Sequence, residues 1–217
     1  MNTLTKLALG MMGQLHPLRA VAGGIQNMPL VRPQRTGGMP LMEALNVRHS
    51  QREFAPQALD PQSLSNLMWA ACGVNRIEHQ GRTMPSAMNG QEVLLYVAMP
   101  QGLYLYVPET HSLQRVVDSD VRRVTGNQDF VDTAPLDLVY VADHSKMKLI
   151  PAAQRTTYAS TSAGAMAQNV YLYCASAGLA TVLRAWFDSD ALSKAMGLEP
   201  DHQLLLSQTV GARKGTH

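Results

Sequence analysis

The feature that most constrains this fold is a long proline-free run, rich in alanine and serine, from Ala153 to Ala177. Gly178 follows it, and glycine is typical of the position directly after a helix. The run therefore predicts one long helix. Small residues recur along it, at Ser160, Ala163, Gly164 and Ala167. They would let another backbone approach closely, either within one core or across a subunit interface, and the sequence leaves both interpretations open.

Shorter segments around this helix predict a mixture of strands and helices. Strand-like runs occupy residues 92–99, 103–107, 136–142, 180–185 and 203–210. Pro100, Gln101 and Gly102 separate the first two runs, which predicts a hairpin. Helices are predicted over residues 41–47 and from the capping residue Asp60 to Gly73. The combination predicts an α+β protein with a single layered domain.

The N-terminal part of the chain has a different character. Residues 23–38 combine glycines and prolines without a helical or alternating period, which predicts an extended arm across the surface. We therefore divide the chain into an N-terminal arm, residues 1–39, and a domain, residues 40–217. A cytoplasmic location is expected. The alternative is export, because residues 7–12 are apolar and residues 20–22 resemble a signal-peptidase site, although polar residues interrupt this stretch.

Charge and cysteine content exclude several classes of function. Lysine and arginine number 18 and aspartate and glutamate 16, so the formal charge of +2 is too small for a protein that neutralises nucleic acid. The two cysteines, Cys72 and Cys174, form no zinc-binding spacing and are expected to be buried thiols in a reducing compartment. No apolar run is long enough to predict a membrane span.

Common catalytic signatures are absent from the sequence. It contains no GxSxG, GxxxxGK[ST], GxGxxG or HExxH motif, and its seven histidines are scattered without a metal-binding spacing. We therefore expect no catalytic dyad and no metal site.

Two polar segments remain as candidates for a binding site. Residues 48–52 carry two arginines and a serine, which can converge on one anion, although a solvated charge cluster is the simpler interpretation. Residues 82–91 precede a strand, and there Ser86 and Asn89 could hydrogen-bond the polar edge of a flat ligand. An ordinary polar turn would explain the second segment equally well.

These segments resemble motifs of the nitroreductase superfamily. Residues 48–54 (RHSQREF) resemble its R-R-S-x-R-x-F signature, and residues 85–91 (PSAMNGQ) resemble its P-S-x-x-N-x-Q segment. Residues 164–179 are similar to its long helix ending in Gly-Leu, and residues 209–211 to its closing strand and glycine. The four motifs occur in the family's order and cover about residues 40 to 213.

The resemblance implies an antiparallel or mixed sheet flanked by helices, in an interlocked homodimer that binds two FMN molecules at its interface. It implies that Arg48 and Ser50 hold the FMN phosphate and ribityl chain. Arg52 would lie toward the pyrimidine edge, where a cation stabilises the charge of reduced flavin. Arg213 or Lys214 would complete the phosphate cage.

Two further groups of residues are assigned by resemblance. Pro85, Ser86, Ala87 and Asn89 would reach the flavin from the partner subunit. The stretch where the family offers a backbone N–H to flavin N5 contains Leu183, Ala185 and Trp186. The sequence departs from the family pattern at two positions, because His49 stands where a second arginine is usual and Trp186 stands where glycine is common.

A closer similarity is to the subgroup containing the dehydrogenases that oxidise azolines to azoles in modified peptides. It rests on residues 81–87 (GRTMPSA) and 102–107 (GLYLYV), with His111 and Leu113 beyond them. Tyr104 and Tyr106 share one face of a strand, and we expect them to pack in the core rather than to contact substrate.

The resemblance predicts an FMN-dependent oxidoreductase in which NAD(P)H reduces FMN and the flavin then reduces a nitroaromatic, quinone or similar acceptor. One alternative is a flavin-dependent oxidase that acts on a peptide azoline or a small molecule. Another is a flavin-binding protein without turnover, in which Trp186 blocks N5. No nucleic-acid or membrane partner is expected.

Overall fold

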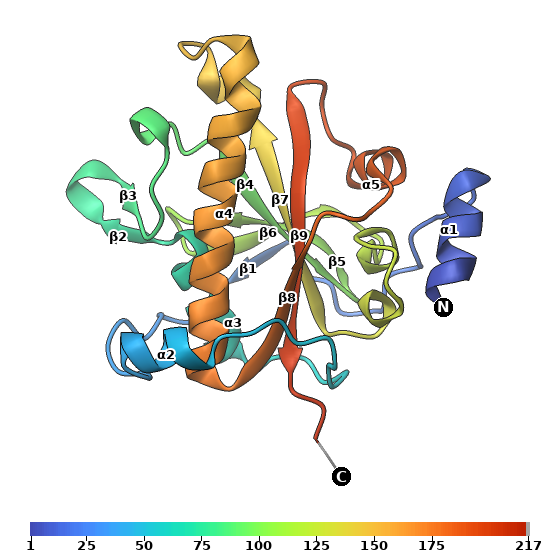
Figure 1. Cartoon of the computed structure of the whole chain (residues 1–217), viewed down its shortest axis with the longest axis horizontal. Coiled ribbons are helices and arrows are strands. Elements are labelled where there is room, and N and C mark those ends of the chain that lie inside the picture. Colours follow the sequence, from blue (N-terminus) through green and yellow to red (C-terminus); the bar gives the residue numbers. More distant parts are fainter. Residues whose placement is uncertain (216–217) are drawn as a thin grey trace.

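The computed structural model describes residues 1–215, which form a seven-stranded sheet with helices on both sides (Figure 1). The helices are α1 (Thr3–Met11), α2 (Leu41–Val47), α3 (Pro61–Cys72), α4 (Ala152–Ala177) and α5 (Ser189–Met196). The strands are β1 (Asn27–Pro29), β2 (Val74–Arg76), β3 (Gly81–Arg82), β4 (Val93–Met99), β5 (Gly102–Val107), β6 (Ser112–Val117), β7 (Leu136–Asp143), β8 (Leu179–Arg184) and β9 (His202–Ala212).

The large sheet has the strand order β1-β6-β5-β4-β7-β9-β8, and every neighbouring pair in it is antiparallel. β4, β5 and β6 are consecutive hairpin partners, while β8 and β9 are joined through α5 and add to the far side of β7. β8 is consequently an edge strand. Strands β2 and β3 form a separate pair. The predicted α+β class, with an antiparallel sheet flanked by helices, is confirmed.

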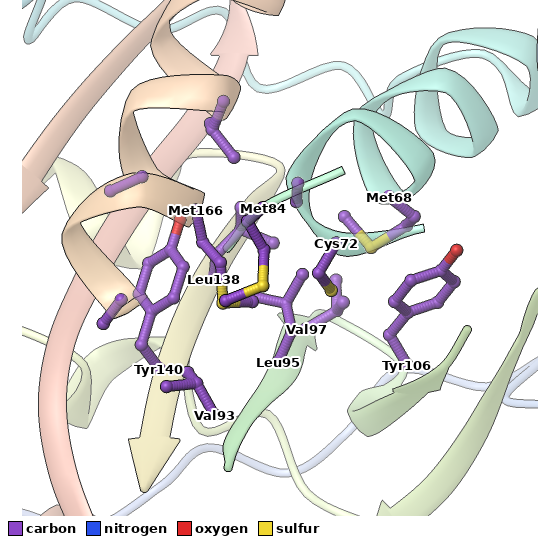
Figure 2. Close-up of a cluster of buried hydrophobic side chains, with 14 of the residues drawn as sticks. Met68, Cys72, Met84, Val93, Leu95, Val97, Tyr106, Leu138, Tyr140 and Met166 are labelled. Carbon is purple, nitrogen blue, oxygen red and sulfur yellow. The ribbon is translucent and has the colours of Figure 1, made fainter. Parts of the chain in front are cut away.

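Both faces of the sheet are buried because its central strands alternate apolar side chains between two cores. On β7, Leu138 and Tyr140 enter the core under α3 and α4, whereas Val139 and Val141 enter the core under α5. Figure 2 shows the first core, where Met84 and Met166 meet above Leu138. Figure 1 shows the layers, with α4 across one face and α5 on the other side.

Local signals explain where the principal helices begin and end. Asp60 accepts hydrogen bonds from the N–H groups of Gln62 and Ser63 and so caps α3. Gly178 ends α4 with a φ of 70°, a left-handed conformation that glycine adopts without strain. The predicted long helix, the helix 41–47 and the helix up to Gly73 all form, each within a residue of the expected boundary.

The structure adds elements that the sequence patterns did not predict. α1, α5, β1 and β6 form as well as the five expected strands. β1 is three residues long, and β6 mixes buried and exposed residues irregularly, so neither shows a clear period. Residues 1–39 were predicted as an arm. Within them β1 pairs with β6, and Lys6 of α1 is fully buried.

Expectations about particular buried residues are confirmed. Cys72 and Cys174 are free and buried, and Tyr104 and Tyr106 both lie in the core. Ala163 and Ala167 of the small-residue stripe face the core, but Gly164 is exposed. No helix within residues 1–215 is long and apolar enough to cross a membrane.

Candidate functional site

Two predicted site segments run side by side beyond the ends of β8 and β9. Phe54 forms an isolated antiparallel bridge with Arg213, and the N–H of Ala55 donates to the carbonyl of Ala212 at 2.9 Å. The segment containing Arg52 therefore lies next to the segment containing Arg213 and Lys214. Between them is a hollow of about 650 Å3, lined by Gln51, Arg52, Glu53, Arg213, Lys214 and Gly215. Three cations against one carboxylate make this hollow suited to an anion.

Arg48 and Ser50 meet on Tyr171, a residue of α4 that the motif comparison did not single out. The Ser50 hydroxyl lies 2.8 Å from the Tyr171 hydroxyl, and the Arg48 guanidinium lies 5.2 Å from the centre of the Tyr171 ring. The N–H of Leu183 donates to the same Tyr171 oxygen at 2.9 Å. Tyr171 thus joins three residues that the family resemblance assigned to the cofactor.

The outer edge of β8, on the side away from β9, faces these residues. The Thr181 carbonyl accepts from the N–H of Gln51 at 2.9 Å, and the Leu183 N–H donates to Tyr171. Backbone groups alternate in direction along a strand, so odd-numbered residues of β8 point away from β9. Ala185 directly follows β8 and is the next position in this odd-numbered series.

The main chain just after β8 is held from its other side. The N–H of Asn127 donates to the Trp186 carbonyl at 3.3 Å, and the buried Arg184 side chain donates to Thr125 and Asp137. The Trp186 indole itself is 52% exposed. This stretch therefore presents an exposed aromatic ring on a backbone with little freedom to move.

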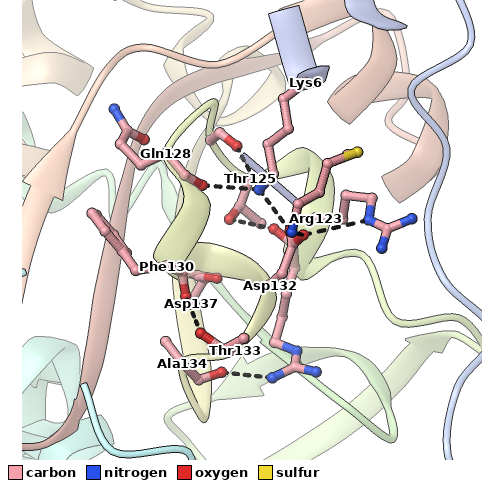
Figure 3. Close-up of polar contacts among 12 residues, drawn as sticks. Lys6, Arg123, Thr125, Gln128, Phe130, Asp132, Thr133, Ala134 and Asp137 are labelled. Carbon is pink, nitrogen blue, oxygen red and sulfur yellow. Dashed lines mark hydrogen bonds and ion pairs between the residues drawn. The ribbon is translucent and has the colours of Figure 1, made fainter. Parts of the chain in front are cut away.

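The loop behind this stretch is fastened by the N-terminal helix. Lys6 pairs with Asp132 at 2.6 Å and donates to the carbonyls of Gly126 and Gln128 (Figure 3). Burial lowers the pKa of Lys6, while Asp132 opposes that shift. On the same loop, Phe130 packs 5.3 Å from Phe54 of the arginine-rich segment, between ring centres. The N-terminal helix, the loop and the candidate site are therefore in physical contact.

The remaining candidates take other positions. His49 is exposed and has both ring nitrogens engaged, with the Val47 carbonyl at 2.7 Å and the Gln51 amide at 2.8 Å. Pro85, Ser86, Ala87 and Asn89 lie after β3. There the Ser86 hydroxyl accepts from the N–H of Gln91 at 3.1 Å. In Figure 1 the β2–β3 pair lies beside the middle of α4, where the Asn169 side chain donates to the Thr83 carbonyl at 3.1 Å, whereas α2, which leads into Arg48, lies at the lower end of α4. One chain therefore does not bring the two segments together.

A second hollow, of about 750 Å3, lies between residues 34–38, α3 and the C-terminal half of α4. Arg35 stacks on Trp69 there, at 5.5 Å from the ring centre, among amide side chains such as Asn66 and Asn169. None of the thirteen residues predicted to bind the cofactor lines it. Among residues 1–215, no three histidine, cysteine or acidic side chains come together in a group that could hold a metal ion.

Tyr171 is the functional candidate that sequence analysis missed. A signal was present, because a tyrosine on the buried side of a helix needs a partner for its hydroxyl. The sequence could not say which partner, since Ser50 and Leu183 are brought to it only by the fold.

Comparison with known proteins gives a consistent result. The model of the nitroreductase family matches residues 45–212. A protein of Methanocaldococcus jannaschii, provisionally named a nitroreductase, is 32% identical over 161 residues, which are 69% of this chain and 81% of that protein. These matches place the chain among the oxidoreductases. It belongs to the nitroreductase family.

Solved structures show the same fold. A provisionally named nitroreductase from Ralstonia eutropha JMP134 is 47% identical with a TM-score of 0.89, covering 93% of this chain and 96% of that chain. A further nitroreductase-like structure, from Desulfovibrio desulfuricans in complex with FMN, is 17% identical with a TM-score of 0.60. The match covers 82% of this chain and 89% of that chain.

Proposed function

We propose that this protein is an FMN-dependent oxidoreductase in which NAD(P)H reduces the flavin and the reduced flavin passes electrons to a nitroaromatic, quinone or similar acceptor. The observation that carries the proposal is that Arg48, Ser50 and Leu183 of β8 meet on Tyr171, next in the chain to the residues 51–53 that line the cationic hollow. Membership of the nitroreductase family supports it, as does the FMN complex of the Desulfovibrio desulfuricans protein.

The residues at this edge fit FMN chemically. Four cations can neutralise a phosphate, namely Arg48, Arg52, Arg213 and Lys214, and Ser50 is an exposed residue between the first two in the chain. The Gln51 side-chain oxygen is buried and has no hydrogen-bond partner within residues 1–215, so it can accept a hydrogen bond from a ribityl hydroxyl. Guanidinium groups, a hydroxyl and a free amide oxygen are the groups that a phosphorylated sugar alcohol requires.

In the proposed mechanism the protein binds and orients, and bound FMN would supply the hydride chemistry. The backbone N–H of Ala185, directly after β8, would hold the flavin ring, and Arg52 would supply positive charge to stabilise the reduced flavin. Because Arg184 and Asn127 fix the strand end, this donor is in place before binding and needs little reorganisation.

We propose that the active form is a homodimer. Leu41 and Met42 of α2 are 62% and 74% exposed, and Met88 beside the 85–89 loop is 75% exposed. Apolar residues this exposed favour contact with another chain. Because one chain keeps residues 85–89 away from Arg48, the loop of a second copy would complete the site. Light scattering coupled to gel filtration should give twice the chain mass, and a monomer that retains FMN would contradict this part of the proposal.

The deciding experiment is an absorbance spectrum of the purified protein before and after NADPH is added without oxygen. A flavin spectrum that bleaches supports both the cofactor and the reductive half-reaction. A flavin spectrum that persists with NADPH and NADH favours the oxidase or the inert flavin-binding protein. Failure of the apoprotein to bind added FMN would contradict the proposal.

A further inference from the structure

The Tyr171 hydroxyl lies between a backbone donor and a side-chain hydroxyl. Its oxygen is 2.9 Å from the Leu183 nitrogen and 2.8 Å from the Ser50 oxygen, and the tyrosine side chain is buried. Ser50 is exposed, and the next residue, Gln51, lines the cationic hollow. Tyr171 therefore connects the edge of β8 to the hydroxyl of an exposed residue next to that hollow.

Counting protons fixes the direction of these hydrogen bonds. The Leu183 N–H can only donate, so the Tyr171 oxygen accepts from it. The Tyr171 proton then needs an acceptor, and within residues 1–215 only Ser50 is in reach. If Ser50 donated instead, a buried tyrosine proton would be left without a partner, which is costly. Tyr171 therefore donates to Ser50, and the Ser50 proton is free to point outward.

A hydroxyl held in this way has its proton free to donate to a ligand and keeps one lone pair that can accept. Arg48 lies over the Tyr171 ring and brings positive charge to the same place. A donor beside a cation selects an anionic oxygen. We propose that Tyr171 is a positioning residue that directs the Ser50 proton to a phosphate oxygen of FMN. The inference rests on the proposed function and assigns a role to a residue to which the family resemblance gave none.

The first test compares Tyr171→Phe with Tyr173→Phe. Tyr173 lies on the same helix and also donates one hydrogen bond, to the Ser63 carbonyl at 3.2 Å, so it controls for the loss of a tyrosine hydroxyl. The FMN dissociation constant of the apoprotein, measured by quenching of flavin fluorescence, should rise about tenfold in Tyr171→Phe, equivalent to about 1.4 kcal/mol. It should change less than about twofold in Tyr173→Phe. Equal effects of the two substitutions would overturn the inference.

Riboflavin, which lacks the phosphate, separates positioning from a structural role. Its affinity should be the same in wild type and Tyr171→Phe, because only the phosphate contact is lost. If the Tyr171 hydroxyl merely stabilised the fold, the affinities for FMN and riboflavin would fall together, and the inference would fail. Ser50→Ala should reproduce the pattern of Tyr171→Phe, and the double variant should be no weaker than Ser50→Ala alone.

The outcomes also separate this inference from the proposed function. A wild-type protein that binds neither flavin contradicts the proposed function itself. A wild-type protein that binds FMN while Ser50→Ala leaves its affinity unchanged contradicts the inference alone. The Ser50→Ala comparison keeps the test decisive even if Tyr171→Phe does not fold.

Discussion

The guanidinium group of Arg184 and the carboxylate of Asp137 form a buried ion pair, with 2.6 Å between Arg184 Nη2 and Asp137 Oδ1. Thr209 bonds to both partners, so the group ties β7, β8 and β9 together. Gly126 makes room for it, because a Cβ at that position would collide with the guanidinium. The pair lies directly before Ala185 and fixes the end of the edge strand at the candidate site.

We predict that Arg184→Met lowers the free energy of unfolding by about 3–5 kcal/mol, because it leaves the Asp137 carboxylate buried without its partner. Urea denaturation followed by circular dichroism measures this. Arg115→Met is the matched control, since its ion-pair partner Asp118 is 74% exposed and such pairs contribute at most about 1 kcal/mol. Similar losses in the two variants would show that the buried pair has no special role.

A second buried chain of hydrogen bonds contains a histidine. Ser65 donates to the Val31 carbonyl, so its oxygen accepts from His111 Nε2 at 2.7 Å. His111 Nδ1 then accepts from the Tyr106 hydroxyl at 2.8 Å. When the His111 ring is neutral, each polar hydrogen of Ser65, His111 and Tyr106 in this chain has an acceptor. Burial lowers the pKa of His111 below its ordinary value of 6.5; Arg35 adds to the effect and the Val31 carbonyl opposes it.

This arrangement predicts a stability loss in acid. Because the folded-state pKa lies below the unfolded one, the contribution of His111 is complete above pH 6.5 and is lost as pH falls through the folded-state value. The free energy of unfolding should fall more steeply between about pH 7 and about pH 5 in wild type than in His111→Asn. Asparagine suits the left-handed backbone at this position, where φ is 47°. If the free energy of unfolding fell equally steeply with pH in both proteins, His111 would not be the cause of the stability loss in acid.

The two cysteines should be chemically inert in the folded protein. Burial raises the pKa of Cys72 to about 12 and raises that of Cys174 as well, so neither forms thiolate near neutral pH. Iodoacetamide at about pH 8 should modify neither residue in native protein and both in denaturant, as mass spectrometry can show. Rapid modification of native protein would contradict the buried environment.

Arg48→Ala should weaken FMN retention. Charge-assisted hydrogen bonds contribute about 1.5–3 kcal/mol each, so the loss of one should raise the FMN dissociation constant at least tenfold. Arg155→Ala is a suitable control, because Arg155 lies on the same helix as Tyr171 and, within residues 1–215, hydrogen-bonds only to the Ile150 carbonyl. An unchanged FMN affinity in Arg48→Ala would remove this residue from the site.

Trp186→Ala tests whether the exposed indole narrows the space beside the flavin. Half of this side chain is already in solvent, so the free energy of unfolding should change by less than about 1 kcal/mol. The ratio of kcat/KM for a bulky quinone to that for a small one should rise. A ratio equal to that of wild type would show that Trp186 does not limit the substrate.

Much of the fold could be predicted because its signals are local. The capping residue Asp60, the glycine after Ala177 and the Pro100–Gly102 turn each act within a few residues, and the elements they delimit appear where expected. β1 and β6 were missed, because a short or irregular strand is stabilised by its neighbours rather than by its own pattern. Their pairing depends on the rest of the sheet.

The candidate site shows the same division. The family could be recognised from the sequence, and so could the residue types of the candidate site, because Arg48, Ser50 and Arg52 stand in one recognisable motif. The contacts of Tyr171 with Ser50 and Leu183, and of Arg184 with Asp137, become visible in the folded structure alone. Hydrogen bonds and ion pairs act over about 3 Å, and their partners here lie 12 to 121 positions apart in the chain. Sequence spacing carries no record of such distances until the sheet and the long helix bring the residues together.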